Sequence, residues 1–384
     1  MNRKTILILG GIVFLLVVGA WIYALVFGPM SPHGGDSFAN FGDGGDSDYV
    51  PSPDDQMITD VRVEENPAEK RLRQLTTNPV AGAVFAENGI YYVEQGTGHL
   101  RHINLVTGSE TLVSGKTIPG AYEAIFSSDG STVAITTTQN GMPKTILAEV
   151  PTFGGTGNLE GESLASGASE IDLETKPGSV LYLVENANGS TGYSYDIAKR
   201  TGTVVFEIPL RDIHVLWGDE IYVYTTPTER QTGYVYKVVG NNLQYVTRGG
   251  IGLMALSYTE GLVVTRKSDG SWTSELVTAD GDIPLAILTI SEKCIGGTER
   301  LFCAVPNTIL SSMIFPDDWY KGVVSLSDSL WSISSQEFAV ALSDFLQESG
   351  REIDVLKMGI NSLESHLFFI NKNDNTLWLY RLPE

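Results

Sequence analysis

Few residues in this chain have the types and spacing needed for chemistry, and metal binding is the first kind to consider. Of five histidines, only His99 and His102 are close together. Three positions apart on a strand, their side chains would point to opposite faces, which does not suit a shared ion. His-Glu-x-x-His and Cys-x-x-Cys patterns are absent. The sequence predicts no metal site and no cofactor.

Nucleophilic catalysis has no better support. The chain contains no Gly-x-Ser-x-Gly sequence, and no histidine is placed to activate a nucleophile. The Gly-rich stretch at 154–157 lacks the Lys-Ser/Thr and the helix of a phosphate-binding loop. Acidic residues are numerous, but no pair stands out. The sequence predicts a protein that is not an enzyme.

The two cysteines, Cys294 and Cys303, lie in the segment EKCIGGTERLFCAV. A turn near Thr298 and Glu299 would place them directly opposite each other on neighbouring strands, within reach of a disulfide. Outside the cytoplasm such a pair is expected to oxidise. The alternative, two reduced buried thiols, stays open because cross-strand disulfide geometry is demanding.

A long loop at 306–328, PNTILSSMIFPDDWYKGVVSLSD, concentrates the candidate binding residues. Loops of this length in compact domains are usually functional or disordered, and aromatic side chains argue against disorder. Tryptophan and tyrosine are common anchors of protein interfaces. The alternative is a lid whose rings pack on their own domain, and a neighbouring pair of carboxylates could meet a cation or a sugar. The candidates are Met313, Phe315, Asp317, Asp318, Trp319 and Tyr320.

The N-terminal region predicts a membrane anchor. Thr5 to Phe27 contains 23 residues without a charge, and a helix of this length would span roughly 35 Å, enough to cross a bilayer. Arg3 and Lys4 precede it, and the next basic residue is Arg62. The positive-inside rule then places residues 1–4 in the cytoplasm and the rest outside. The apolar stretch is too long for an ordinary signal peptide, although cleavage stays open.

Residues 28–68 predict a flexible linker. The segment is dense in Gly, Asp, Ser and Pro and has no apolar period, so it cannot bury enough surface to become ordered. The formal net charge of the chain is −21. An acidic exterior argues against nucleic acid as a partner, because phosphates require a basic surface.

Residues 69–384 show an internal repeat. Phe85 and Phe126 lie 41 residues apart, and each precedes a tight-turn dipeptide, Asn-Gly or Asp-Gly. An apolar strand follows and recurs seven times, near Ile90, Val133, Leu181, Ile221, Leu262, Leu301 and Leu367. Repeats of about 40–50 residues are typical of four-stranded propeller blades. The sequence predicts an all-β, seven-bladed β-propeller.

The last repeat spacing, 66 residues, is longer than the others because it holds two insertions. One is the 306–328 loop. The other, at 335–349, is predicted to be a helix that replaces or covers the outer strand of blade 6. Ser334 and Glu337 have capping-box spacing, several apolar residues share one helical face, and Gly350 would end the helix.

Closure of the ring can also be predicted. Blade 7 supplies three strands, at about 354–359, 366–370 and 376–380. An uncovered last strand would be an aggregation hazard. Arg71 to Leu75 stands before its blade as the outer strands of other repeats do, so we expect it to pair with Thr376–Arg381 as the fourth strand.

The segments SSDGSTVAI and INKNDNTLWLYRL resemble those of bacterial WD-repeat-like (WD40-like) and TolB-like propellers. The stretch RLFCAVPNTI…PDDWYKGVVSLSDSLWSI is similar to membrane-anchored propellers of reduced-genome bacteria, a family without assigned activity. The resemblance covers roughly 69–384 and implies a propeller fold, but it brings no catalytic residues. The Trp-Asp dipeptide of true WD repeats is missing.

These observations favour a non-catalytic, single-pass membrane protein with a signal anchor and its propeller outside the cytoplasm, at the cell surface or in the periplasm. Its expected role is a scaffold for protein partners in the bacterial cell envelope. The alternative is a glycan or small-ligand receptor that binds at the mouth of the propeller channel. An envelope enzyme is the third hypothesis.

Overall fold

The computed structural model describes residues 70–383, except 87–88, 152–156, 174, 259–260, 310–311 and 335–338. The predicted cytoplasmic end (1–4), membrane helix (5–27) and linker (28–68) therefore lie outside the described residues. Within the described part, no helix is both long enough and apolar enough to cross a membrane.

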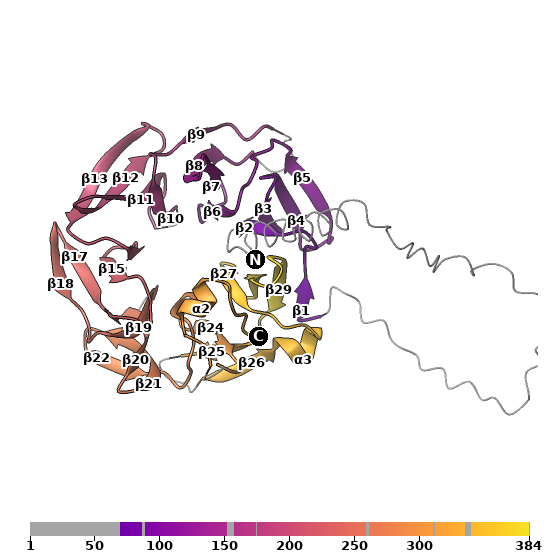
Figure 1. Ribbon diagram of the computed structural model, residues 1–384. Helices are drawn as coiled ribbons and strands as arrows, with labels where there is room; N and C mark the ends of the chain where they lie inside the picture. The colour runs from indigo at the N-terminus through magenta and orange to yellow at the C-terminus, as the bar shows by residue number, and fades with distance from the viewer. Residues whose placement is uncertain are drawn as a thin grey trace, which may run out of the picture. The chain divides into compact units, whose positions relative to one another are not determined.

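The described residues form seven antiparallel sheets arranged as the blades of a ring (Figure 1). The first strands of the blades lie towards the centre and strands such as β5, β13, β18 and β22 lie at the rim. The first three blades contain β2 Val80–Ala86, β3 Gly89–Glu94, β4 Leu100–Asn104 and β5 Glu110–Ser114; β6 Glu123–Phe126, β7 Thr132–Gln139, β8 Met142–Glu149 and β9 Gly161–Ser163; and β10 Ala168–Asp172, β11 Ser179–Asn186, β12 Gly189–Asp196 and β13 Thr201–Ile208.

Blade 5 differs from the others because a short strand from the blade 4 loop, β16, joins its inner edge. Blades 4 and 5 contain β14 Ile213–Leu216, β15 Ile221–Thr225, β17 Val235–Val239 and β18 Asn242–Tyr245; and β16 Thr232–Gly233, β19 Gly250–Tyr258, β20 Gly261–Ser268, β21 Ser271–Thr278 and β22 Gly281–Pro284. Blades 6 and 7 contain β23 Cys294–Gly296, β24 Leu301–Pro306, β25 Asp328–Ile333 and β26 Val340–Asp344; and β27 Val355–Ile360, β28 His366–Asn371, β29 Leu377–Arg381 and β1 Leu72–Gln74.

The seven apolar segments found in the sequence are the second strands of the seven blades. They correspond to β3, β7, β11, β15, β20, β24 and β28. Second strands have a neighbouring strand on each edge and a neighbouring blade on each face, so they are largely buried; every residue of β3 is buried. The predicted fold class and the blade count are confirmed.

The helix predicted at 335–349 is wrong over Val340–Asp344. This segment is the outer strand β26, which pairs with β25 through contacts such as Ser332 with Val340. The open edge of β25 offers backbone hydrogen bonds to a fourth strand. These bonds stabilise the strand more than the helical spacing of apolar residues stabilises a helix. Residues 335–338 of the predicted helix lie outside the described residues; among the described ones, Phe345–Ser349 forms a helix, α3, with Asp344 as its N-cap and Gly350 in the left-handed conformation after it.

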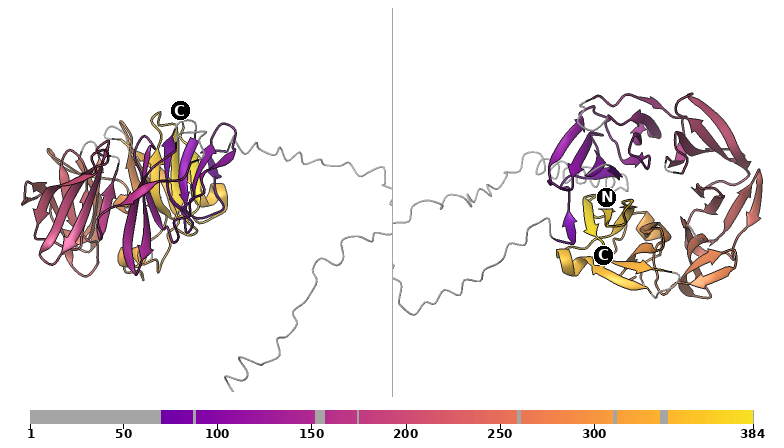
Figure 2. Two further views of the ribbon diagram at one scale, coloured as in Figure 1. Left: turned by 90° about the horizontal axis from the view of Figure 1, so that it is seen from above. Right: turned by 180° about the vertical axis from the view of Figure 1, so that it is seen from behind.

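The ring is closed by strands from both ends of the domain, as predicted. β1 pairs antiparallel with β29, and Leu72 lies opposite Tyr380. The Leu75 amide donates to the Leu377 carbonyl at 2.8 Å, and the Arg381 amide donates to the Arg71 carbonyl at 2.8 Å. Both views in Figure 2 show the strands of the closing blade as part of the ring. The last strand is therefore covered.

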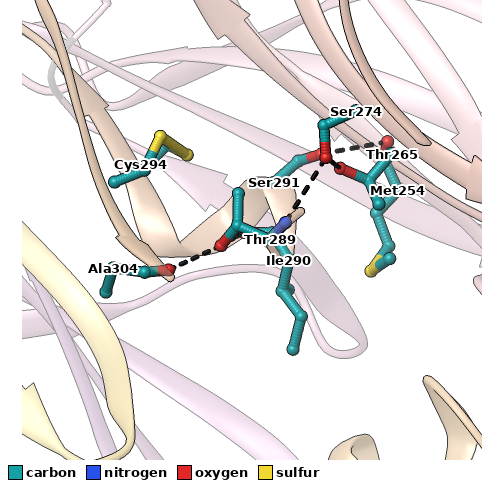
Figure 3. Close-up of a disulfide and its surroundings, with 9 residues drawn as sticks. Met254, Thr265, Ser274, Thr289, Ile290, Ser291, Cys294 and Ala304 are labelled. Atoms are coloured by element: carbon teal, nitrogen blue, oxygen red, sulfur yellow. Dashed lines mark hydrogen bonds between the residues drawn. A yellow bond between two sulfur atoms is a disulfide. The ribbon is translucent and has the colours of Figure 1, made fainter. Parts of the chain in front are cut away.

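The cysteine segment forms β23, its turn and β24, and the two strands pair Cys294 directly with Cys303. A disulfide joins the two residues, with their Cα atoms 4.1 Å apart. Both are buried. The surroundings are held by hydrogen bonds from Thr289, whose hydroxyl donates to the Ala304 carbonyl at 2.5 Å (Figure 3). Blade 6 is thus fixed covalently between its first two strands.

Candidate functional site

The long loop predicted at 306–328 connects β24 to β25, the second and third strands of blade 6. Because β23 and β24 are antiparallel, this loop lies on the face of the propeller at which β23 begins. The 3-10 helix η1, Ser291–Lys293, precedes β23 there, and the loop carries one short helix, α2, Asp317–Tyr320. Figure 1 places α2 on the inner side of blade 6.

Two of the predicted binding rings face the propeller itself. Phe315 and Trp319 are 2% and 1% exposed. They pack in a cluster with Met254, Ile290 and Leu326. The described geometry therefore matches the alternative in which the loop is a lid on its own domain.

The two carboxylates of α2 also bond internally. Asp317 accepts hydrogen bonds from the Thr228 hydroxyl at 3.0 Å and the Glu229 amide at 2.7 Å, which ties the lid to blade 4. Burial alone would raise the pKa of Asp317, but these hydrogen bonds lower it below the ordinary value. Asp318 accepts from the Ile314 amide at 2.8 Å. These contacts hold the shape of the loop.

Three large apolar or aromatic side chains of the loop are exposed, beside the exposed Lys321. Ile314 is 51% exposed, Val323 69% and Tyr320 36%, whereas Met313 is half-buried. The Tyr320 hydroxyl donates to Glu292 at 2.8 Å, so its ring has a fixed orientation. We call Ile314, Tyr320 and Val323 the lid patch. Of the predicted binding residues, only Tyr320 belongs to it.

Beneath the lid lies a charged cluster that the sequence analysis did not identify. Lys293, Asp328 and Asp354 are all fully buried. The Lys293 Nζ lies 2.6 Å from Asp328 Oδ2 and 2.6 Å from Asp354 Oδ1. The Trp319 indole donates to both oxygens of Asp354 at 3.0 Å. The buried ring thus connects the lid to the charged cluster.

Burial and the negative charge of Asp354 raise the pKa of Asp328, although Lys293 opposes this shift. A sequence signal for the cluster did exist. Asp354 stands between Ile353 and Val355, and all three residues are fully buried. A carboxylate that lies between buried apolar residues, where a strand begins, needs a hydrogen-bond donor or a cation as its partner. The lysines were the candidates for that partner.

A second group of polar and aromatic side chains extends from the lid to blades 3 and 4, on the first strands β10 and β14 and the second strand β15. The Tyr224 hydroxyl donates to Glu292 at 3.1 Å, the same carboxylate that binds Tyr320. His214 stacks on the Tyr224 ring with centroids 5.0 Å apart. His214 Nδ1 lies 3.3 Å from a carboxylate oxygen of Glu170. The sequence does not indicate this contact, because Glu170 lies on another blade than His214.

This arrangement predicts a pH dependence of stability. Burial lowers the pKa of His214, but the hydrogen bond and charge of Glu170 raise it above 6.5 overall. The stabilisation is therefore complete below pH 6.5 and is lost as the pH rises through the higher folded-state pKa. We expect the difference in Tm between wild type and His214→Gln to be larger at pH 6 than at pH 9.

Thermal unfolding followed by circular dichroism across this range measures the difference. His366 offers an opposite control, because burial and the nearby Arg73 and Arg381 lower its pKa. His366→Gln should then change the pH dependence in the other direction. A Tm difference for His214→Gln that does not vary with pH would contradict the role of Glu170.

A cavity of about 800 Å³ lies at the carboxyl ends of the inner strands β2, β6 and β27. The lid lies on the opposite face of the propeller, where the inner strands begin. Its lining includes Phe85, Phe126 and Leu363. Lys357 on β27 donates to Glu123 on β6 at 2.9 Å, which links blades 7 and 2 beside blade 1. The volume is within the range of small-molecule sites, about 300–1,000 Å³.

Metal coordination was also sought in the described part of the chain. There, no group of three or more His, Cys, Asp or Glu side chains could hold a metal ion. The carboxylates near the lid instead bond to amides, a hydroxyl, an indole and the ammonium groups of Lys293 and Lys321.

No protein-family model matches this chain, and no curated protein matches it in sequence. Solved structures do match. The β-propeller domain of the Trilobed protease from Pyrococcus furiosus is 9% identical, with a TM-score of 0.51 over 80% of this chain and 95% of that chain. An acylaminoacyl peptidase is 11% identical, with a TM-score of 0.51 over 80% of this chain and 52% of the peptidase.

TolB from Acinetobacter baumannii is 14% identical over 54% of this chain and 55% of that chain, with a TM-score of 0.37, too low to bear on the fold. At these identities, structural similarity indicates shared architecture and does not transfer function. The seven sheets and the match to the β-propeller domain of the Trilobed protease agree on the architecture: this chain has the fold of a seven-bladed β-propeller.

Proposed function

We propose that this protein is a non-catalytic binding module, and that the lid patch is its contact surface for a protein partner. The observation that carries the proposal is the division of the lid into two sides. Phe315 and Trp319 are buried and fix the loop, while Ile314 and Val323 point outward. A surface that is already ordered loses less conformational entropy when it binds.

The charges near the lid support a non-catalytic role. Lys293, Asp328 and Asp354 are fully buried, so they are shielded from a substrate arriving from solvent. Asp317 is held by Thr228 and Glu229. Groups engaged in this way hold the lid in place.

The location of the protein is part of the same proposal. An uncharged segment at 5–27 followed by an acidic linker would hold the propeller outside the cytoplasmic membrane. A disulfide between Cys294 and Cys303 suits an oxidising compartment. The partner would then be another protein of the cell envelope.

The test is the double substitution Ile314→Ser with Val323→Ser. We expect it to remove a partner that cross-links to wild type in native membranes, and to weaken binding of that purified partner by about tenfold or more, as for central apolar contacts. Val106→Ser is the matched control, because Val106 is 83% exposed on the β4–β5 turn of blade 1. It should bind as wild type does.

A specific alternative is a small ligand or glycan in the 800 Å³ cavity. Binding of a cell-wall fragment with equal affinity by wild type and by the double variant would favour that alternative. If an identified partner binds the double variant as tightly as it binds wild type, the lid patch is not its contact surface.

A further inference from the structure

The charged cluster beneath the lid has a composition that a simple ion pair does not explain. It holds one ammonium and two carboxyl groups, all fully buried. A second cation, the half-buried Lys372, lies with its Nζ 5.0 Å from the centroid of the Trp319 ring and is attracted electrostatically to Asp354. Burial and the negative charge of Asp354 raise the pKa of Asp328, which favours its neutral form. Partner binding at the lid patch makes no use of these groups.

The two carboxyl groups differ in their surroundings. Asp354 accepts from the Trp319 indole on both oxygens and from the Leu326 amide at 2.9 Å. Asp328 accepts from Lys293 and from the Val355 amide on Oδ2. Its buried Oδ1 has no hydrogen-bond partner among the described residues. Both oxygens of Asp354 are thus engaged by donors, whereas Oδ1 of Asp328 is left open to carry a proton.

We propose that Lys293 and Asp328 react to form an amide cross-link, with Asp354 moving the protons. The Lys293 nitrogen already contacts the carboxyl group that it would attack, at 2.6 Å from Oδ2. Both residues belong to ordered elements, η1 and β25. Such fixed contact can raise the effective concentration of two reactants by many orders of magnitude.

The atoms balance without any further reactant. The Lys293 ammonium first gives a proton to the Asp354 carboxylate. The freed electron pair on Nζ attacks Cγ of the neutral Asp328 carboxyl, forming the C–N bond. The Cγ–OH bond then breaks, and the hydroxyl leaves as water with the second proton from nitrogen, relayed by Asp354. The products are one amide, one water and a protonated Asp354, all neutral.

The link would close a covalent loop around the lid. Asp328 is the first residue after the lid segment 307–327, and Lys293 is next to Cys294 of the disulfide. Blade 6 would then carry two adjacent covalent links. The amide would persist under reducing conditions, which break the disulfide.

The experiment is mass spectrometry of the purified full-length protein after denaturation and reduction. We expect wild type to be lighter than Lys293→Arg by one water molecule beyond the substitution itself. Trypsin should fail to cleave after Lys293, and a single peptide pair should join residues 293 and 328. Asp354→Asn should remove the loss of water by removing the proton acceptor.

Lys357→Arg is the matched control, because Lys357 pairs with Glu123 at 2.9 Å in a half-exposed site. It should keep the loss of water. Wild type with its full mass and normal cleavage after Lys293 would overturn the proposal, as would a link to Asp354 or between other residues. The wild-type digest decides the matter even if a variant fails to fold.

Discussion

Truncation of the chain after Ile370 should abolish cooperative unfolding of the whole propeller. The truncation removes β29, whose Leu377, Trp378, Leu379 and Tyr380 are all buried. Each such side chain contributes about 1.5–3 kcal/mol when buried. Their combined loss is comparable with the entire net stability of a domain, about 5–15 kcal/mol. It also leaves β1 without its partner and opens the ring.

Deletion of Arg71–Leu75 should also abolish cooperative unfolding, because it removes β1 and exposes the edge of β29. Deletion of residues 50–54, five residues of the predicted linker, is the matched control and should leave the unfolding transition unchanged. A milder variant, Leu72→Ala, should lower stability by about 2–5 kcal/mol, because Leu72 is buried in the blade 7 core. Calorimetry or circular dichroism measures all four.

A cooperative transition at the wild-type temperature in either shortened protein would show that the ring does not depend on this pairing. Loss of folding only in the truncated protein, with the Arg71–Leu75 deletion unaffected, would assign the effect to the β29 side chains rather than to closure. The structure predicts that both fail, since each strand is the edge partner of the other.

Substitution of Lys293 by Met should destabilise the protein by about 3–5 kcal/mol at neutral pH, because it leaves the buried Asp328 and Asp354 side chains without the nitrogen that partners them. The Lys293 Nζ lies 2.6 Å from Asp328 Oδ2 and 2.6 Å from Asp354 Oδ1. The lid is connected to the same groups through Trp319. Protease cleavage within 307–327 should therefore increase together with the loss of stability.

The double variant Lys293→Met with Asp328→Asn should be less destabilised than Lys293→Met alone, because it also removes one of the two acids. Lys199→Met is the control, since Lys199 pairs with Asp196 on the surface and is 76% exposed; it should not change the transition. Chemical denaturation measures the three variants. Equal stability of Lys293→Met and wild type would mean that the cluster contributes nothing to the fold.

Closure could be predicted from sequence because it depends on counting strands. Blade 7 lacked one strand, and Arg71–Leu75 stood before its blade as the outer strands of other repeats do. The disulfide register could be predicted because Cys294 and Cys303 flank one short turn. In both cases the information is carried by short-range pattern and by the requirement that strand edges be paired.

The helix prediction failed for a related reason. Leu342, Phe345 and Leu346 have helical spacing, but spacing describes only the segment's own preference. The open edge of β25 accepted the segment as β26, and this pairing with another strand cannot be read from the spacing within the segment. The neighbouring strand decided between strand and helix, and of the described residues in the segment it left Phe345–Ser349 helical.

The sequence by itself determined the repeat, the number of blades and the way the ring is closed, because strand period and turn residues are local properties. Only the tertiary structure decided which side of the 307–327 loop faces solvent. It also brought Lys293, Asp328 and Asp354 together from three separate elements. Which side chains are buried, and which charged groups they pair with, depends on which blades are neighbours. The spacing of residues within one segment cannot indicate this.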